Sequence, residues 1–127
     1  MFEPDRTLRE SLDSVRVPGD FGYAIRNFLD RFRAQPNPTW LEEEPDFLVT
    51  RLNDDGYADA FVAAVAEHLS GSNSFPCPRW ASRADRVKKI PWFAAKSPNL
   101  KAILIQETPA AFRIRNLFVS ANALSRA

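Results

Sequence analysis

The amino-acid sequence predicts an all-α protein, a compact bundle of about five to seven short helices with proline-rich connections. Apolar residues recur at helical spacing in several segments, which is the main signal for amphipathic helices. The chain has 10 prolines but only 4 glycines, a balance that suits short helices ended by proline better than a β-sandwich or barrel. Its 127 residues, of which 45% are apolar, suit one domain (1–127) with its own core.

The N-terminal part of the chain predicts two helices, near residues 6–15 and 21–33. In the second, the apolar residues fall on one helical stripe: Phe21, Ala24, Ile25, Phe28, Leu29 and Phe32. Asp20 follows the turn-forming pair Pro18-Gly19 and is expected to be the N-cap. The first, shorter helix is expected to turn three apolar residues inward, Leu8, Leu12 and Val15.

A further helix is predicted for residues 57–69, after a turn at 53–56. Its several alanines raise the helix propensity and permit close packing. The inner stripe is expected to be Tyr57, Phe61, Ala64, Val65 and Leu69. A short turn is expected at 38–41. Residues 71–74 (Gly-Ser-Asn-Ser) then break the chain and are a possible joint.

Prolines divide the second half of the chain, and two of them mark helix starts. Ser97-Pro98 and Thr108-Pro109 each place a capping hydroxyl before a proline at the first helical position. They predict helices over 99–107 and 110–116, and a last short helix is expected over 120–125. In the first of these helices, three apolar residues are expected to face the core, Leu100, Ile103 and Leu104.

Charge is distributed unevenly along the chain, although the net charge is only +1. The acidic half, residues 1–70, holds 7 Lys and Arg against 14 Asp and Glu and carries −7, whereas the basic half, residues 71–127, holds 10 against 2 and carries +8. Two explanations are open. Either the halves pack together with their charges facing each other or solvent, or the basic half meets an acidic partner, a protein or a nucleic acid.

The sequence lacks the motifs of common catalytic and cofactor sites. One histidine and one cysteine are too few for a zinc site of these residues, and there is no glycine-rich phosphate loop or nucleophile elbow. The sequence therefore indicates no catalytic residue, no metal and no cofactor. His68 and Cys77 are interpreted as structural. A hypothetical carboxylate site of Asp54, Asp55 and Asp59 has less support, because capping explains these residues.

Three features bear on the cellular compartment. The N-terminal sequence is charged and has no apolar segment typical of a secretory signal. The apolar runs are too short to span a bilayer. A single cysteine cannot form an internal disulfide, so we expect a cytoplasmic protein.

The basic residues of the second half are interleaved with aromatic ones. Such a pattern can hold single-stranded nucleic acid by charge and stacking. We favour a core position for these aromatic residues, because large aromatic side chains dominate protein cores. They are Trp80, Trp92, Phe93, Phe112 and Phe118. No helix-turn-helix is recognised, since Pro76 and Pro78 would disrupt a recognition helix.

The C-terminal sequence RNLFVSANALSRA, residues 115–127, resembles the ending of an uncharacterised bacterial family of short helical proteins. Further similarity lies in FLD (28–30), AAVAEHL (63–69) and PWFA (91–94), so the resemblance spans most of the chain. Members of that family are often encoded beside a gene for a nucleotidyltransferase-like protein, an arrangement similar to a two-gene toxin–antitoxin module. The resemblance implies that this protein is the small, antitoxin-like partner, and it implies no particular functional residue.

Our first hypothesis is a non-enzymatic protein-binding partner, antitoxin-like, that restrains a neighbouring nucleotidyltransferase-type enzyme. Two halves of opposite charge favour specific docking and fast association. The expected contacts with the partner are Arg113, Arg115, Asn116 and Arg126, with Arg86, Lys88 and Lys89 as a second patch. The alternative hypothesis is a nucleic-acid-binding accessory protein or autorepressor that uses the basic C-terminal half.

Overall fold

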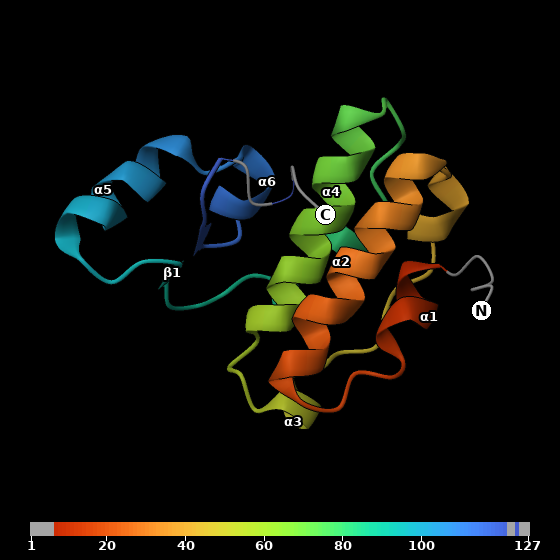
Figure 1. Cartoon of the computed structure of the whole chain (residues 1–127), viewed down its shortest axis with the longest axis horizontal. Coiled ribbons are helices and arrows are strands. Elements are labelled where there is room, and N and C mark those ends of the chain that lie inside the picture. Colours follow the sequence, from red (N-terminus) through yellow and green to blue (C-terminus); the bar gives the residue numbers. More distant parts are fainter. Residues whose placement is uncertain (1–6, 122–123, 125–127) are drawn as a thin grey trace.

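The computed structural model describes residues 7–121 and Leu124, and it confirms the mainly α-helical fold (Figure 1). Six α-helices occur in this part of the chain: α1 Leu8–Leu12, α2 Pro18–Ala34, α3 Val49–Leu52, α4 Tyr57–Ser72, α5 Pro98–Glu107 and α6 Ala110–Arg113. Three 3₁₀ turns and two short strands complete it: η1 Pro38–Leu41, η2 Arg79–Ser82, η3 Ala84–Arg86, β1 Trp92–Phe93 and β2 Leu117–Phe118.

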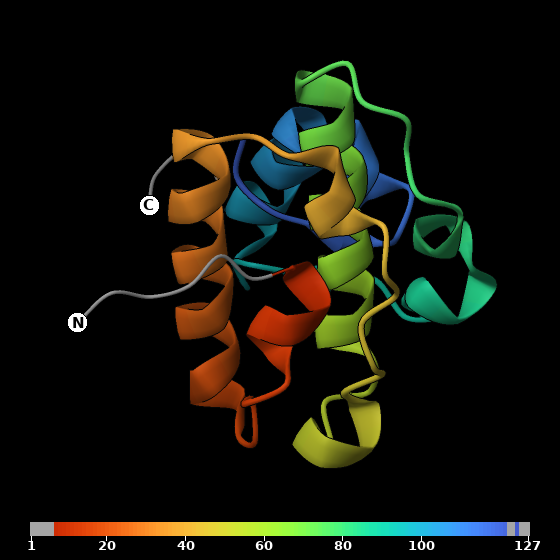
Figure 2. The same cartoon turned by 90° about the vertical axis from the view of Figure 1, so that its right-hand side faces the viewer.

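Helices α2 and α4 run side by side through the middle of the molecule (Figures 1 and 2). The predicted apolar stripe of α2 is confirmed, with Phe21, Ile25, Phe28, Leu29 and Phe32 all buried. Phe21 meets Phe61 of α4 edge-to-face, with 5.7 Å between the ring centroids. Aromatic pairs of this geometry add to the stability that burial alone provides.

The start of α2 differs from the prediction. The helix begins at Pro18 with Val17 as its N-cap, so Asp20 is not the N-cap. The Asp20 carboxylate instead accepts hydrogen bonds from the backbone N–H groups of Arg16 and Val17. Proline is well suited to the first helical position, so the predicted turn at Pro18 is the first turn of the helix itself.

Helix α4 is buried on most of its circumference, whereas the sequence predicted one inner stripe. Besides Ala64, Val65 and Leu69, the residues Ala58, Asp59, Ala60, Val62, Ala63, Ala66 and Ser70 are buried. Alanine side chains are short enough for α6, η2 and η3 to contact the same helix. The helix also continues through Gly71 to Ser72, so half of the predicted joint at 71–74 is helical.

Short elements of the acidic half close around α2 and α4. A capping box formed by Thr7 and Glu10 begins α1. The three residues predicted to face inward, Leu8, Leu12 and Val15, are buried. In η1, Trp40 packs against Phe28 and Phe32 of α2.

Helix α3 was not predicted, and its position depends on a residue of α4. The buried Asp59 carboxylate accepts hydrogen bonds from the backbone N–H groups of Leu48 (2.6 Å) and Val49 (3.2 Å), where α3 begins. Burial raises the pKa of Asp59, while the backbone donors and the charge of Arg86 oppose this shift. Asp59, a residue of α4, therefore holds the start of α3 in place. From the sequence, Asp59 was explained only as a cap of its own helix.

The basic half begins with turns and then forms α5, α6 and a minimal sheet. As predicted, α5 starts after Ser97, whose hydroxyl accepts a hydrogen bond from the Leu100 N–H. Strands β1 and β2 pair in parallel, and Phe93 stacks on Phe118. Parallel pairing joins two segments that are separated in the sequence by α5 and α6. A strand of two residues is too short to show the alternating pattern by which strands are recognised in a sequence.

Helix α6 is shorter than predicted, and its start has a different cap. It ends at Arg113 rather than Asn116, because Asn116 has a left-handed backbone (φ 62°). Thr108 does not cap it; the buried hydroxyl lies within hydrogen-bond distance of two acceptors, the carbonyls of Leu104 and Val119, and accepts from the Val119 N–H. The predicted last helix, 120–125, falls partly on residues 122, 123 and 125, which lie outside the described residues.

Candidate partner-binding surface

The structure separates the seven residues expected to contact a partner. Three of them, Arg86, Lys88 and Arg115, are buried, with exposed fractions of 0%, 7% and 2%. Arg113 and Lys89 are exposed, and Asn116 is half-buried. Arg126 lies outside the described residues. The expectation that Arg86, Lys88 and Arg115 form outward-facing contacts is therefore corrected.

Arg86 links the acidic and basic halves from inside the molecule. Its guanidinium contacts Glu44 at 3.2 Å and donates to the backbone carbonyls of Pro45 (2.6 Å) and Asp59 (3.3 Å). The rings of Phe47 and Trp80 lie 4.2 and 5.0 Å from it. Burial lowers the pKa of Arg86 and the Glu44 carboxylate raises it. A planar group with five donors can meet all these partners, whereas lysine could not.

Arg115 and Lys88 make similar internal contacts. Arg115 pairs with Glu67 of α4 at 2.8 Å and donates to the carbonyls of Ala111 and Ala81. The Lys88 ammonium pairs with Asp55 at 3.1 Å. Thus both cations bind carboxylates of the acidic half, and their charges are not free for another molecule.

The polar side chain of Asn116 is also used within the chain. Its side-chain amide donates to the Lys88 backbone carbonyl at 2.7 Å, and the backbone carbonyl of Asn116 accepts from the Trp92 N–H. Asparagine tolerates the left-handed conformation better than most residues. These contacts tie the end of α6 to β1, which is a structural role.

Several aromatic residues of the basic half lie in the core, as favoured from the sequence. Trp80 and Phe112 are buried, and Trp92 packs against the core from a half-buried position. The Trp80 indole N–H donates to the Leu41 carbonyl at 2.9 Å. Stacking of nucleic-acid bases needs accessible rings, so these three side chains do not provide a stacking platform.

Helix α5 carries the exposed apolar residues that the sequence assigned to the core. Leu104 is buried (7% exposed), whereas Leu100 and Ile103 are half exposed, at 51% and 50%. Ile105, on the other side of Leu104, is 49% exposed. Figure 1 shows α5 set out to one side of the α2–α4 pair, beyond α6. A signal was present in the sequence: successive helical residues point about 100° apart, so Ile103, Leu104 and Ile105 cannot all face one core.

Basic residues border this helix. Lys96 lies just before it, and the Lys101 ammonium lies 5.2 Å from the centre of the Phe93 ring. Arg113 donates to the carbonyls of Gln106 and Thr108 where α5 ends. Among the described residues, none of these three cations forms an ion pair with a carboxylate. We define the α5 surface as Leu100 and Ile103 together with Lys96, Lys101 and Arg113.

The remaining candidate groups are placed as follows. Asp54 accepts hydrogen bonds from the Gly56 and Ala58 N–H groups, Asp55 pairs with Lys88, and Asp59 is buried beneath α3. Across residues 7–121 and Leu124, no group of three or more His, Cys, Asp or Glu side chains could hold a metal ion. No helix in this same part of the chain has the length and hydropathy to cross a membrane.

The described chain is thus a mainly α-helical protein with one helix, α5, set out from its core. Comparisons with protein-family models, with curated proteins and with solved structures give no match for it. The bacterial family that residues 115–127 resemble stays a prediction from the sequence.

Proposed function

We propose that this protein is a non-enzymatic, antitoxin-like binding partner that docks onto another protein through the α5 surface. The observation that carries the proposal is the half-exposed state of Leu100 and Ile103 on a helix whose only buried residue is Leu104. Full burial of a large apolar side chain contributes about 1.5–3 kcal/mol, so each half-exposed residue forgoes about half of that burial free energy. Exposed apolar groups with a polar border are typical of protein-binding sites.

Charge indicates what kind of surface the partner presents. Lys96, Lys101 and Arg113 border the apolar residues and have no carboxylate partner among the described residues. An acidic border on the partner would complement them and speed association. Two copies of this chain, paired through α5, would instead bring like charges together, so a different, acidic protein is favoured over self-association.

The class of partner comes from the family resemblance and not from the geometry. That resemblance implies a nucleotidyltransferase-type enzyme encoded beside this protein, with both acting in the cytoplasm. Docking of α5 into a groove of the enzyme would restrain it, as antitoxin-like partners do. The helix-in-groove mode uses anchors three or four residues apart, and Leu100 and Ile103 have this spacing.

Copurification tests the proposal. The tagged protein is expressed in its own host with the adjacent nucleotidyltransferase-like protein and is purified with and without nuclease. We expect a stoichiometric complex that survives nuclease and that is lost with the double variant Leu100→Asp, Ile103→Asp. Equal recovery of the enzyme with this variant would contradict docking through α5, and no complex at micromolar concentration would contradict the partner class.

Nucleic-acid binding remains the second candidate because Lys89, Lys96, Lys101 and Arg113 stay accessible. It has less support than protein binding, since Arg86 and Arg115 are internal and their charges are paired. Phosphate binding loses affinity steeply with salt. Complex formation that depends on nucleic acid and disappears between low and moderate salt would favour this candidate.

A further inference from the structure

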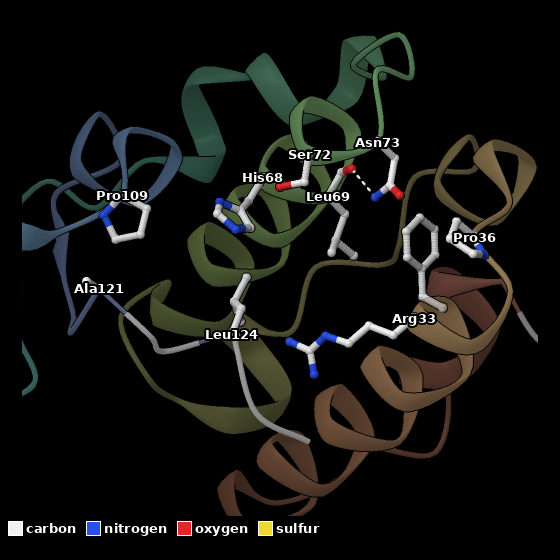
Figure 3. Close-up of a pocket in the computed structure, with 10 residues that line it drawn as sticks. Arg33, Pro36, His68, Leu69, Ser72, Asn73, Pro109, Ala121 and Leu124 are labelled. Atoms are coloured by element: carbon white, nitrogen blue, oxygen red, sulfur yellow. Dashed lines mark hydrogen bonds between the residues drawn. The ribbon is translucent and has the colours of Figure 1, made fainter.

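A cleft between α2 and α4 brings together groups that the proposed protein interface does not use. It has a volume of about 330 Å³ and lies where the C-terminal ends of α2 and α4 meet the residues around Pro109 and Leu124. Figure 3 shows Arg33 extending from α2 towards Leu124, while His68 and Ser72 project into the cleft from successive turns of α4. The Asn73 side-chain amide donates a hydrogen bond to the Leu69 carbonyl (2.8 Å), which Figure 3 marks with a dashed line.

The polar groups of this cleft favour a negative charge. Arg33 supplies a permanent positive charge, and the Ser72 hydroxyl and the His68 imidazole can donate hydrogen bonds. Neither aspartate nor glutamate occurs among the described residues that line the cleft. In the folded chain, burial and, to a lesser degree, the charge of Arg33 lower the pKa of His68. Among its described residues the cleft therefore presents the charge of Arg33 beside the imidazole of His68, whose pKa is lowered, and this combination suits a monoanion.

The apolar groups of the cleft favour a ligand with an apolar body. Phe32 and Leu69 form part of its wall from the core side, and Pro36, Pro109 and Leu124 contribute from the edges. Ligand pockets usually combine such walls with a few polar groups that fix orientation, and a volume near 300 Å³ is at the small end of their range.

From this arrangement we infer that the cleft binds a small organic monocarboxylate, with its carboxylate between Arg33, His68 and Ser72 and its apolar body against Phe32 and Leu69. Arginine and a carboxylate form strong charge-assisted hydrogen bonds. A bound carboxylate also favours the imidazolium form of His68, so ligand binding and protonation of this residue are coupled. The site shares no residue with the α5 surface.

NMR titration of the full chain tests this inference, because His68 is the only histidine and its imidazole signals are unambiguous. The probe is 3-phenylpropionate, compared with the neutral 3-phenylpropionamide and with inorganic phosphate. We expect saturable shifts of the His68 signals below about 10 mM carboxylate. The measured pKa of His68 is expected to rise, and both the amide and phosphate are expected to bind at least about tenfold more weakly.

The matched variants are Arg33→Gln and Arg26→Gln, which remove exposed arginines of the same helix inside and outside the cleft. Arg33→Gln is expected to weaken carboxylate binding about tenfold or more, and Arg26→Gln to leave it unchanged. Thermal melts check that both variants are folded. The inference is overturned by an absence of saturable shifts, by equal binding of the amide or of phosphate, or by equal affinities of the two variants.

Discussion

At the scale of single residues, burial decides which charged side chains are available to another molecule. The sequence presents Arg86 and Arg79 as similar members of one basic segment, yet Arg86 is fully buried and Arg79 is exposed. Sequence reasoning could predict a basic half but not which of its cations turn inward. That depends on carboxylates and carbonyls more than 25 residues away, such as Glu44 and the Asp59 backbone.

The first prediction compares the contributions of buried Arg86 and exposed Arg79 to stability. Arg86→Ala should lower the free energy of unfolding by about 3 kcal/mol, because it leaves the carbonyls of Pro45 and Asp59 without their donor and removes the buried partner of Glu44. Arg79→Ala should change it by less than about 0.5 kcal/mol. Urea denaturation followed by circular dichroism measures both. Similar midpoints for the two variants would show that the Arg86 contacts do not stabilise the fold.

The second prediction concerns His68 and pH. Its folded-state pKa is lowered by burial and by Arg33, so the unfolded chain binds this proton more readily. Its contribution to stability is therefore complete above the unfolded pKa of about 6.5 and is lost as the pH falls through and below that value. Wild type should lose more stability than His68→Gln between about pH 7.5 and 5.5.

Urea denaturation at both pH values, with wild type and His68→Gln side by side, provides the comparison. Because the carboxylates titrate in both proteins, the difference between them reports on His68. A pH-dependent loss of equal size in the two proteins would rule out a lowered pKa in the folded state.

At the scale of secondary structure, the sequence predicts where helices lie better than which way they face. The caps and prolines at Ser97-Pro98 identified α5 because capping is local chemistry. Which face of α5 is buried depends on its contact with β2, a segment that lies beyond α6 in the sequence. The two-residue strands and α3 were missed for the same reason: Asp59 and the β1–β2 pairing are contacts between distant segments.

The third prediction uses two leucines of α5 that differ in exposure. Leu104→Ala should lower the free energy of unfolding by about 2 kcal/mol, because it removes buried apolar surface and leaves a cavity. Leu100→Ala should change it by less than about 0.5 kcal/mol, since half of that side chain is already in water and alanine is a good helix former. Thermal or urea denaturation of the pair measures the difference. Equal losses would mean that Leu100 packs in the core.

At the scale of the whole molecule, the opposite charges of the two halves partly face each other. Four ion pairs cross between them within the described residues: Glu44 with Arg83 and Arg86, Asp55 with Lys88, and Glu67 with Arg115. These pairs support the explanation in which the two halves of the chain pack together with their charges facing each other. Among the described residues of the basic half, the cations at α5 together with Arg79 and Lys89 have no ion pair and are available to an acidic partner.

The fourth prediction follows from these contacts and from the position of α4. Because α4 is covered by α2 from the acidic half and by α6, η2 and η3 from the basic half, the chain should unfold in one cooperative step. Tryptophan fluorescence and far-ultraviolet circular dichroism should then give coincident urea transitions. Two separate transitions would instead identify residues 71–74 as a joint between independently stable parts.

The central claim is that α5 is where this protein holds its partner. The most direct test is isothermal titration calorimetry of the nucleotidyltransferase-type enzyme with wild type, Ile103→Asp and Ile114→Asp. Ile114 is a suitable control, because it is at least as exposed (61%) but is not part of the α5 surface. We predict that Ile103→Asp weakens binding about thirtyfold or more, as expected for a central interface residue, while Ile114→Asp binds like wild type. Equal affinity of wild type and Ile103→Asp would contradict the claim.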